Sequence, residues 1–121
     1  MRIVKETVCL FAVLALGAQS AIAHTHLKSS DPADGSELQA APKQITLTFG
    51  DPVQLTALDV AANGGKPQSM KGLPGEVLKV VTVPVPPLKS GKYVVTWRAA
   101  GHDGHVMSGQ FKFSIKPPEP K

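Results

Sequence analysis

Two short clusters hold all four histidines of this 121-residue chain, His24-Thr25-His26 and His102-Asp103-Gly104-His105. Imidazole and carboxylate groups are side chains from which proteins build sites for borderline divalent metals. The clusters lie far apart in the sequence, so a fold that joined them would make one site from both. The histidines and Asp103 are therefore the first candidates for chemistry.

The residues ahead of the first cluster have the organisation of a secretory signal peptide. Arg2 and Lys5 form a basic start, the following stretch is almost all apolar, and Ala21-Ile22-Ala23 supplies the small residues of a cleavage site. The apolar stretch is shorter than the roughly 20 residues that a membrane-spanning helix needs, which disfavours an uncleaved anchor. We predict a signal peptide over residues 1–23, a periplasmic location and a mature chain that begins at His24.

A mature chain that begins with histidine can chelate a metal through its own terminus. The free α-amine has an ordinary pKa of about 7.7–8.0 and can lose its proton to a metal near neutral pH. His24 then offers this amine and its ring Nδ1 to the same ion. His26 lies on the same side in an extended strand, or closes an amine–amide–imidazole plane as the third residue. Both arrangements favour Cu(II), whereas the alternative is a pair of solvated histidines.

The second cluster offers a carboxylate and an imidazole two residues apart. On an extended segment Asp103 and His105 face the same side, and Gly104 lets the backbone bend or approach a ligand. Together with two nitrogens from His24 they make a set of three nitrogens and one oxygen, which suits one Cu(II) ion better than Zn(II), Mg(II) or Ca(II). His102 should point away and lie at the surface or beside the site. The alternative is a polar loop with a surface histidine.

Composition limits the mature chain to one small domain. Without the leader 98 of the 121 residues remain, which is enough for a single core. Cys9 is the only cysteine and leaves with the leader, so the mature domain has no disulfide. The full chain has a formal charge of +4, but its lysines are scattered among few aromatics, which argues against nucleic acid as a partner. We predict a domain over residues 24–116 and a disordered tail over residues 117–121.

The elements that must position these clusters read as strands. Short segments with apolar residues at every second position are separated by Pro and Gly, a pattern typical of an antiparallel sandwich or barrel. Pro84-Val85-Pro86-Pro87 should break pairing or lie at an edge. Strands are predicted over Lys43–Gly50, Gln54–Ala61, Glu76–Val83, Lys92–Ala100 and Gln110–Ile115, with an opening strand at His24–Ser29.

The order of several blocks resembles the CopC family of periplasmic copper-binding proteins. The blocks run from His24 through His26–Ser36, Ala41-Pro42, Phe49–Val53, Gly91–Arg98 and Asp103–Phe111. The resemblance implies an all-β, seven-stranded Greek-key β-sandwich of cupredoxin-like or immunoglobulin-like type. It also implies a Cu(II) site made by the amine and ring of His24 with Asp103 and His105. In this site His26 either is a further ligand or supports the other ligands. The family has no established enzymatic reaction and often works beside a CopD-type inner-membrane protein.

This chain departs from the family pattern at several positions. Some members carry a second, Cu(I) site in a methionine-rich loop, but only Met70 and Met107 follow the leader here, so that site should be absent. We expect Met70 in an exposed loop and Met107 in the core or near the site. Asp51 stands where the family usually has Glu, and its part in the site is left open. Gly101-His102 replaces the Ser and small residue that commonly precede Asp-Gly-His.

The leading hypothesis is a monomeric periplasmic protein that carries or buffers Cu(II) for a membrane partner. A second hypothesis is a copper oxygenase that attacks polysaccharides through a processed N-terminal histidine. The mature chain has one Tyr, one Trp and no Cys, so the aromatic face and disulfides of such enzymes are missing, and we predict no enzyme activity. A third hypothesis, a metal-free immunoglobulin-like interaction module, explains the fold but leaves both histidine clusters without a role.

Overall fold

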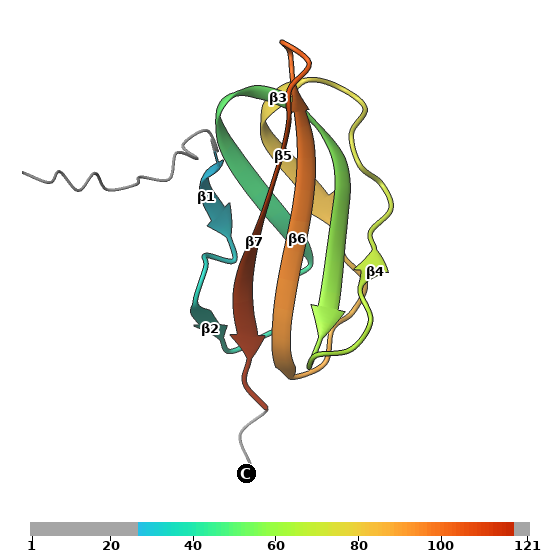
Figure 1. The fold of residues 1–121 in the computed structure, drawn as a ribbon. Coiled ribbons are helices and arrows are strands. Elements are labelled where there is room, and N and C mark those ends of the chain that lie inside the picture. The colour runs from blue at the N-terminus through green and yellow to red at the C-terminus, as the bar shows by residue number, and fades with distance from the viewer. Residues whose placement is uncertain (1–26, 118–121) are drawn as a thin grey trace, which may run out of the picture.

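The computed structural model describes residues 27–117, which form seven strands (Figure 1). The predicted leader, His24, His26 and residues 118–121 lie outside this range. No helix long and apolar enough to cross a membrane occurs among the described residues. The strands are β1 (Leu27–Asp31), β2 (Ser36–Leu38), β3 (Gln44–Ala62), β4 (Gln68–Ser69), β5 (Leu78–Pro84), β6 (Gly91–Gly101) and β7 (Val106–Ile115).

The long strand β3 belongs to both layers of the molecule. Its first half lies between β1 and β5, and its second half pairs with β6 and with β4. In Figure 1 this strand arches over the upper end. The sequence predicted two separate strands here, which was wrong, because the chain bends through Gly50-Asp51-Pro52 without leaving the extended conformation. Pairing with β5 is interrupted between Thr48 and Val53, where Pro52 cannot donate an N–H.

The second layer is built on the β6–β7 hairpin. These strands pair from Gly91 with Ile115 up to Ala100 with Val106. β2 pairs with β7 in parallel, so the sheet is mixed rather than wholly antiparallel as predicted. β2 and β4 were missed because segments of three and two residues carry too little alternation to detect. The prediction of an all-β, seven-stranded sandwich is confirmed.

Alternate residues of the strands fill one apolar core. Trp97 is 2% exposed, and its ring meets that of Phe49 edge-on with centroids 5.2 Å apart. Tyr93 stacks on Phe113 at the same centroid separation. Burying a large apolar side chain contributes roughly 1.5–3 kcal/mol, and none of the buried residues between 27 and 117 is polar or charged. Such a core explains how the domain holds together without a disulfide.

The two methionines of the described chain both contact this core. The expectation of an exposed Met70 was wrong, because its side chain is 8% exposed and its backbone N–H donates to the carbonyl oxygen of Leu58 at 2.8 Å. The polar, exposed neighbours Ser69 and Lys71 hid this residue in the sequence pattern. Met107 is half-buried and packs against the core, as expected. Flexible thioether side chains fill gaps of this kind.

Candidate metal centre

The second histidine cluster lies in the tight loop that joins β6 to β7. The N–H of Gly101 donates to the carbonyl oxygen of His105 at 2.8 Å, and the N–H of Gly104 donates to that of Gly101 at 2.9 Å. Gly104 has a φ of 89°, a left-handed conformation that favours glycine and typically closes three-residue hairpin loops. The sequence predicted an extended segment, and the structure replaces it with a turn.

The turn holds Asp103 and His105 against each other. Oδ1 of Asp103 accepts the backbone N–H of His105 at 3.0 Å, and Oδ2 lies 2.9 Å from Nδ1 of the same histidine. An aspartate that accepts the N–H two residues ahead is a common device for fixing a turn. The two side chains are therefore brought together by the loop itself rather than by strand geometry.

These hydrogen bonds shift the pKa values of Asp103 and His105 in opposite directions. The backbone N–H and then the ring of His105 lower the pKa of Asp103 to about 2, so this carboxyl stays ionised at neutral pH. The hydrogen bond to Asp103 and the charge of that carboxylate raise the pKa of His105. The side chains are 60% and 84% exposed, respectively, so water screens the pair and leaves both groups open to a ligand.

The ionised carboxylate also selects the tautomer of the neutral imidazole. A carboxylate can only accept hydrogen bonds, so Nδ1 of His105 must carry the proton that lies between them. Nε2 is then left with its lone pair free. A carboxylate that holds one ring nitrogen while the other faces a metal is the usual arrangement around metal-binding histidines. His105 is therefore prepared to donate through Nε2.

Gly101 makes room for this arrangement, which the sequence analysis did not foresee. A Cβ at this position would stand 3.1 Å from Oδ1 of Asp103 and 3.5 Å from the methyl group of Met107. A side chain at position 101 would crowd the carboxylate of Asp103. The only sequence signal was a glycine just before the His-Asp-Gly-His run.

The other candidate residues are placed near the pair or lie outside the described range. His102 is exposed in the loop, and Asp51 is exposed in the bend of β3. His24 and His26 precede Leu27 and are not described. No group of three or more His, Cys, Asp or Glu side chains suited to a metal occurs within residues 27–117. The described pair therefore needs donors from elsewhere to complete a metal site.

The chain approaches this loop at the start of β1. Leu27 pairs with Phe49, and Val53, four residues along β3, pairs with Gly101 at the base of the loop. Four residues of strand span about 13 Å. β1 begins in the upper half of Figure 1, toward the end that carries the β6–β7 loop. The first described residue thus lies toward the same end of the sandwich as Asp103 and His105.

We expect Asp103→Asn to lower the pKa of His105 toward its ordinary value of about 6.5 in the copper-free protein. The raised value means that the ion pair stabilises the fold at pH below the unfolded-state pKa. This contribution is lost as pH rises through the folded-state pKa. A pH titration of the His105 ring protons by NMR measures the shift, and Asp51→Asn, an exposed acid outside the pair, is the matched control. A His105 titration unchanged by Asp103→Asn would show that the pair does not form in solution.

Comparison with known proteins supports the resemblance noted in the sequence. A family model described as the CopC domain matches residues 27–116. Copper resistance protein C of Escherichia coli is 36% identical over 110 residues, covering 82% of this chain and 86% of that protein. Copper transport protein CutJ of Bacillus subtilis is 29% identical over 116 residues, which cover 89% of this chain but 21% of that protein.

A solved structure agrees with the fold as well. The crystal structure of CopC from Methylosinus trichosporium OB3b matches with a TM-score of 0.70 at 28% identity, covering 81% of this chain and 99% of that one. The family model spans almost every described residue, and the chain belongs to the CopC family.

Proposed function

We propose that the mature protein binds one Cu(II) ion in the periplasm and carries or buffers it for a membrane partner. The observation that carries this proposal is the hydrogen-bonded pair of Asp103 and His105, exposed at the tip of the β6–β7 hairpin. The pair presents a free imidazole nitrogen beside an ionised carboxylate. Asp103 also fixes the turn through the backbone N–H of His105, but the exposed ring of His105 makes no hydrogen bond other than that to Asp103 within residues 27–117.

The missing donors are the amine and ring of His24. Two residues separate His24 from Leu27, and the three steps of chain from one Cα to the other can span at most about 10 Å. Leu27 pairs with Phe49 of β3, and Gly101 pairs with Val53 of the same strand, four residues further on. A terminus of this length would therefore extend toward the β6–β7 loop. His24 would supply two nitrogens, His105 one nitrogen and Asp103 one oxygen. The hydrogen bond between Asp103 and Nδ1 of His105 would open so that both side chains reach the same ion. Asp51, exposed in the bend of β3, and His26, two residues after His24 in the sequence, are the next candidate donors to test.

This donor set explains the choice of metal. Three nitrogens and a carboxylate oxygen suit the tetragonal preference of Cu(II), whereas Mg(II) and Ca(II) require oxygen-rich sites. The described chain adds no soft ligand beyond Met70, which is buried in the core, and Met107, which packs against it. Cu(II) rather than Cu(I) is therefore the proposed cargo.

The relatives support a role in copper traffic. One is named a copper resistance protein, and in another a CopC-like part makes up about a fifth of a copper transport protein. We propose that the present protein serves a separate CopD-type inner-membrane protein, to which the predicted signal peptide would bring it, and that it acts as a monomer.

The oxygenase hypothesis has less support. The aromatic residues of the described chain, Phe49, Tyr93, Trp97, Phe111 and Phe113, are all buried. A flat aromatic surface for a polysaccharide therefore does not form from residues 27–117. The hypothesis of a metal-free interaction module rests on the fold alone and gives no reason for the Asp103–His105 pair.

Titration of the form that begins at His24 with Cu(II) tests the proposal. We expect one ion per chain, and we expect His105→Ala to weaken binding by about 100-fold, at the upper end of what loss of a residue supporting a metal ligand costs. His102→Ala is the matched control because it changes an exposed histidine of the same loop, and it should alter affinity less than about two-fold. Equal affinity of the His105→Ala form and the unchanged protein would refute the site.

A further inference from the structure

The end of the sandwich opposite the β6–β7 loop carries most of the lysines. Lys92 lies at the start of β6 and pairs with Ser114 near the end of β7, and Lys112 pairs with Val94. Lys116 donates its backbone N–H to the carbonyl oxygen of Leu38 at 2.9 Å. These residues are far apart in the sequence, and the fold gathers them at one end.

Three more lysines join them from the neighbouring loops. The carbonyl oxygen of Lys43 accepts the N–H of Val85, and that of Lys89 accepts the hydroxyl of Tyr93. Lys66 follows the turn that ends β3. All six side chains are exposed. We call this set the lysine end, and it consists of Lys43, Lys66, Lys89, Lys92, Lys112 and Lys116.

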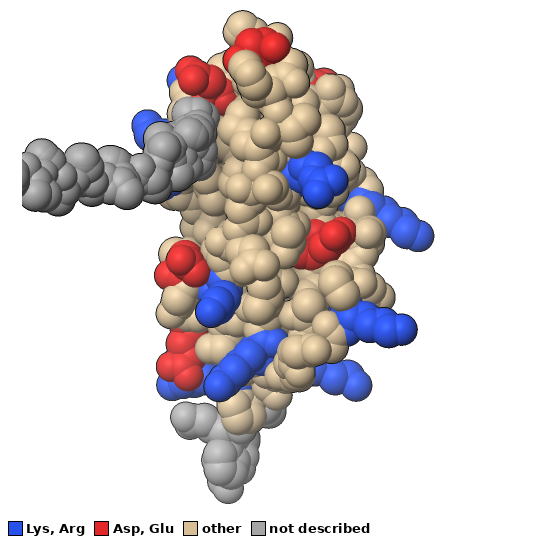
Figure 2. Space-filling view, in the orientation of Figure 1, with Lys and Arg blue, Asp and Glu red and all other residues tan. Residues whose placement is uncertain are grey.

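The positive charge of the lysine end is not neutralised by contacts within the described chain. The ion pair of Asp103 with His105 is the only one among residues 27–117. Two acids lie nearby: Glu37 in β2 is exposed, and the carboxylate of Asp34 accepts the backbone N–H of Lys112. Figure 2 shows basic side chains gathered toward the lower end of the face in view, with acidic side chains among them at the lower left, and side chains of both signs in the upper half. The lysine end therefore carries an excess of positive charge, because six lysines face two acids.

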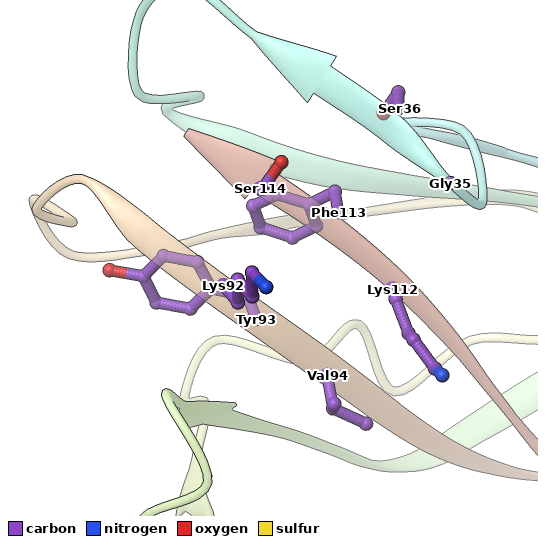
Figure 3. Close-up of a pocket in the computed structure, with 8 residues that line it drawn as sticks. All are labelled: Gly35, Ser36, Lys92, Tyr93, Val94, Lys112, Phe113 and Ser114. Carbon is purple, nitrogen blue, oxygen red and sulfur yellow. The ribbon is translucent and has the colours of Figure 1, made fainter. Parts of the chain in front are cut away.

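A shallow groove adds a concave surface to this end. It has a volume of about 320 Å³ and lies across β2, β6 and β7. Figure 3 shows Lys92, Lys112 and Ser114 among the residues that line it, with the hydroxyl of Ser114 directed toward β2 and the ammonium group of Lys112 directed away from it. The lining of the groove is mostly apolar, so the exposed lysines around it supply the positive charge of this end.

We propose that the lysine end binds the surface of an anionic phospholipid bilayer through its exposed ammonium groups. Clusters of basic side chains are attracted to such surfaces, and each lysine increases partitioning by about five-fold. The export proposed above would place the protein next to a bilayer. A single-stranded nucleic acid would require exposed aromatic side chains, and the aromatics of residues 27–117 are buried.

Co-sedimentation with lipid vesicles tests this proposal on the form that begins at His24. At about 0.1 M NaCl the protein should bind phosphatidylglycerol vesicles and not phosphatidylcholine vesicles. Raising NaCl to about 0.5 M should release it, because the Debye length shortens and the attraction between opposite charges is screened. Lys92→Gln with Lys112→Gln should weaken binding by about 25-fold, since two lysines are lost. Lys28→Gln with Lys79→Gln removes the same charge from exposed lysines outside the lysine end, and this control should change binding less than two-fold.

Several outcomes would overturn the proposal. Equal weakening by the two double variants would mean that only net charge matters, and equal binding to both lipids would remove the electrostatic basis. Release by inorganic phosphate would assign the lysine end to the free anion, and equally tight capture of a single-stranded oligonucleotide would indicate a general polyanion surface. Copper titration of the Lys92 and Lys112 double variant should be unchanged, so failure of the copper proposal and failure of this one can be told apart.

Discussion

A form with one extra residue ahead of His24 should bind Cu(II) about 1,000-fold more weakly than the form that begins at His24. The extension converts the α-amine into a peptide nitrogen and leaves the imidazole without its chelate partner, so two of the four proposed donors are affected. Changes to residues that merely orient a metal ligand already cost 10–100-fold, and the loss here should exceed that range. Competition against a chelator of known affinity measures the difference.

Two comparisons make this experiment decisive. His105→Ala in the extended form should weaken binding little further, because the remaining donors no longer form a chelate. The chain isolated from the periplasm should have the mass of residues 24–121, which shows that cleavage exposes the required amine. An extended form with unchanged affinity would show that the terminus of His24 does not bind the metal.

Trp97→Ala should lower the free energy of unfolding by about 3–5 kcal/mol, the usual cost of removing a large buried aromatic side chain. The ring is 2% exposed, packs edge-on against Phe49, and lies so close to Gly109 that a Cβ there would stand 2.8 Å from a ring carbon. Gly109, which pairs with Trp97 across the hairpin, has no side chain that could fill the space. Urea unfolding followed by circular dichroism measures the change.

Arg98→Ala is the matched control for Trp97. Arg98 is the next residue in β6, faces the opposite side and is exposed, so its replacement should change stability by less than about 0.5 kcal/mol. Similar losses from both replacements would mean that the strand itself, and not the packing of the indole ring, is sensitive. A stable Trp97→Ala form would contradict the central place of this residue in the core.

Sequence alternation predicted the strands that bury one face. Trp97 and its neighbours in β6 alternate between buried and exposed positions, so that strand could be located from residue types alone. The continuity of β3 could not, because Gly50-Asp51-Pro52 reads as a break, although the backbone passes through it in extended form. Met70 was misplaced for a similar reason, since its burial depends on a partner strand that its own neighbours do not reveal.

The candidate site was predictable in its residue types but only partly in its geometry. Asp103 and His105 were expected to meet, yet the hydrogen bonds that join them come from a turn whose shape depends on Gly104. Their relation to the start of β1 depends on strand registers that no local pattern contains. The lysines that appear scattered along the chain illustrate the same limit, because only the pairing of distant strands gathers them at one end.

The passage of β3 through both layers has a mechanical consequence. The edge strand β1, which follows His24 in the sequence, and the hairpin that carries His105 both pair with β3. Their pairing positions on β3, Phe49 and Val53, are four residues apart. An ion held between them would close a ring through this stretch and brace the outermost strand against fraying. Copper would then act as a cross-link between β1 and the β6–β7 hairpin, and its release would weaken the pairing of β1 before that of any other strand.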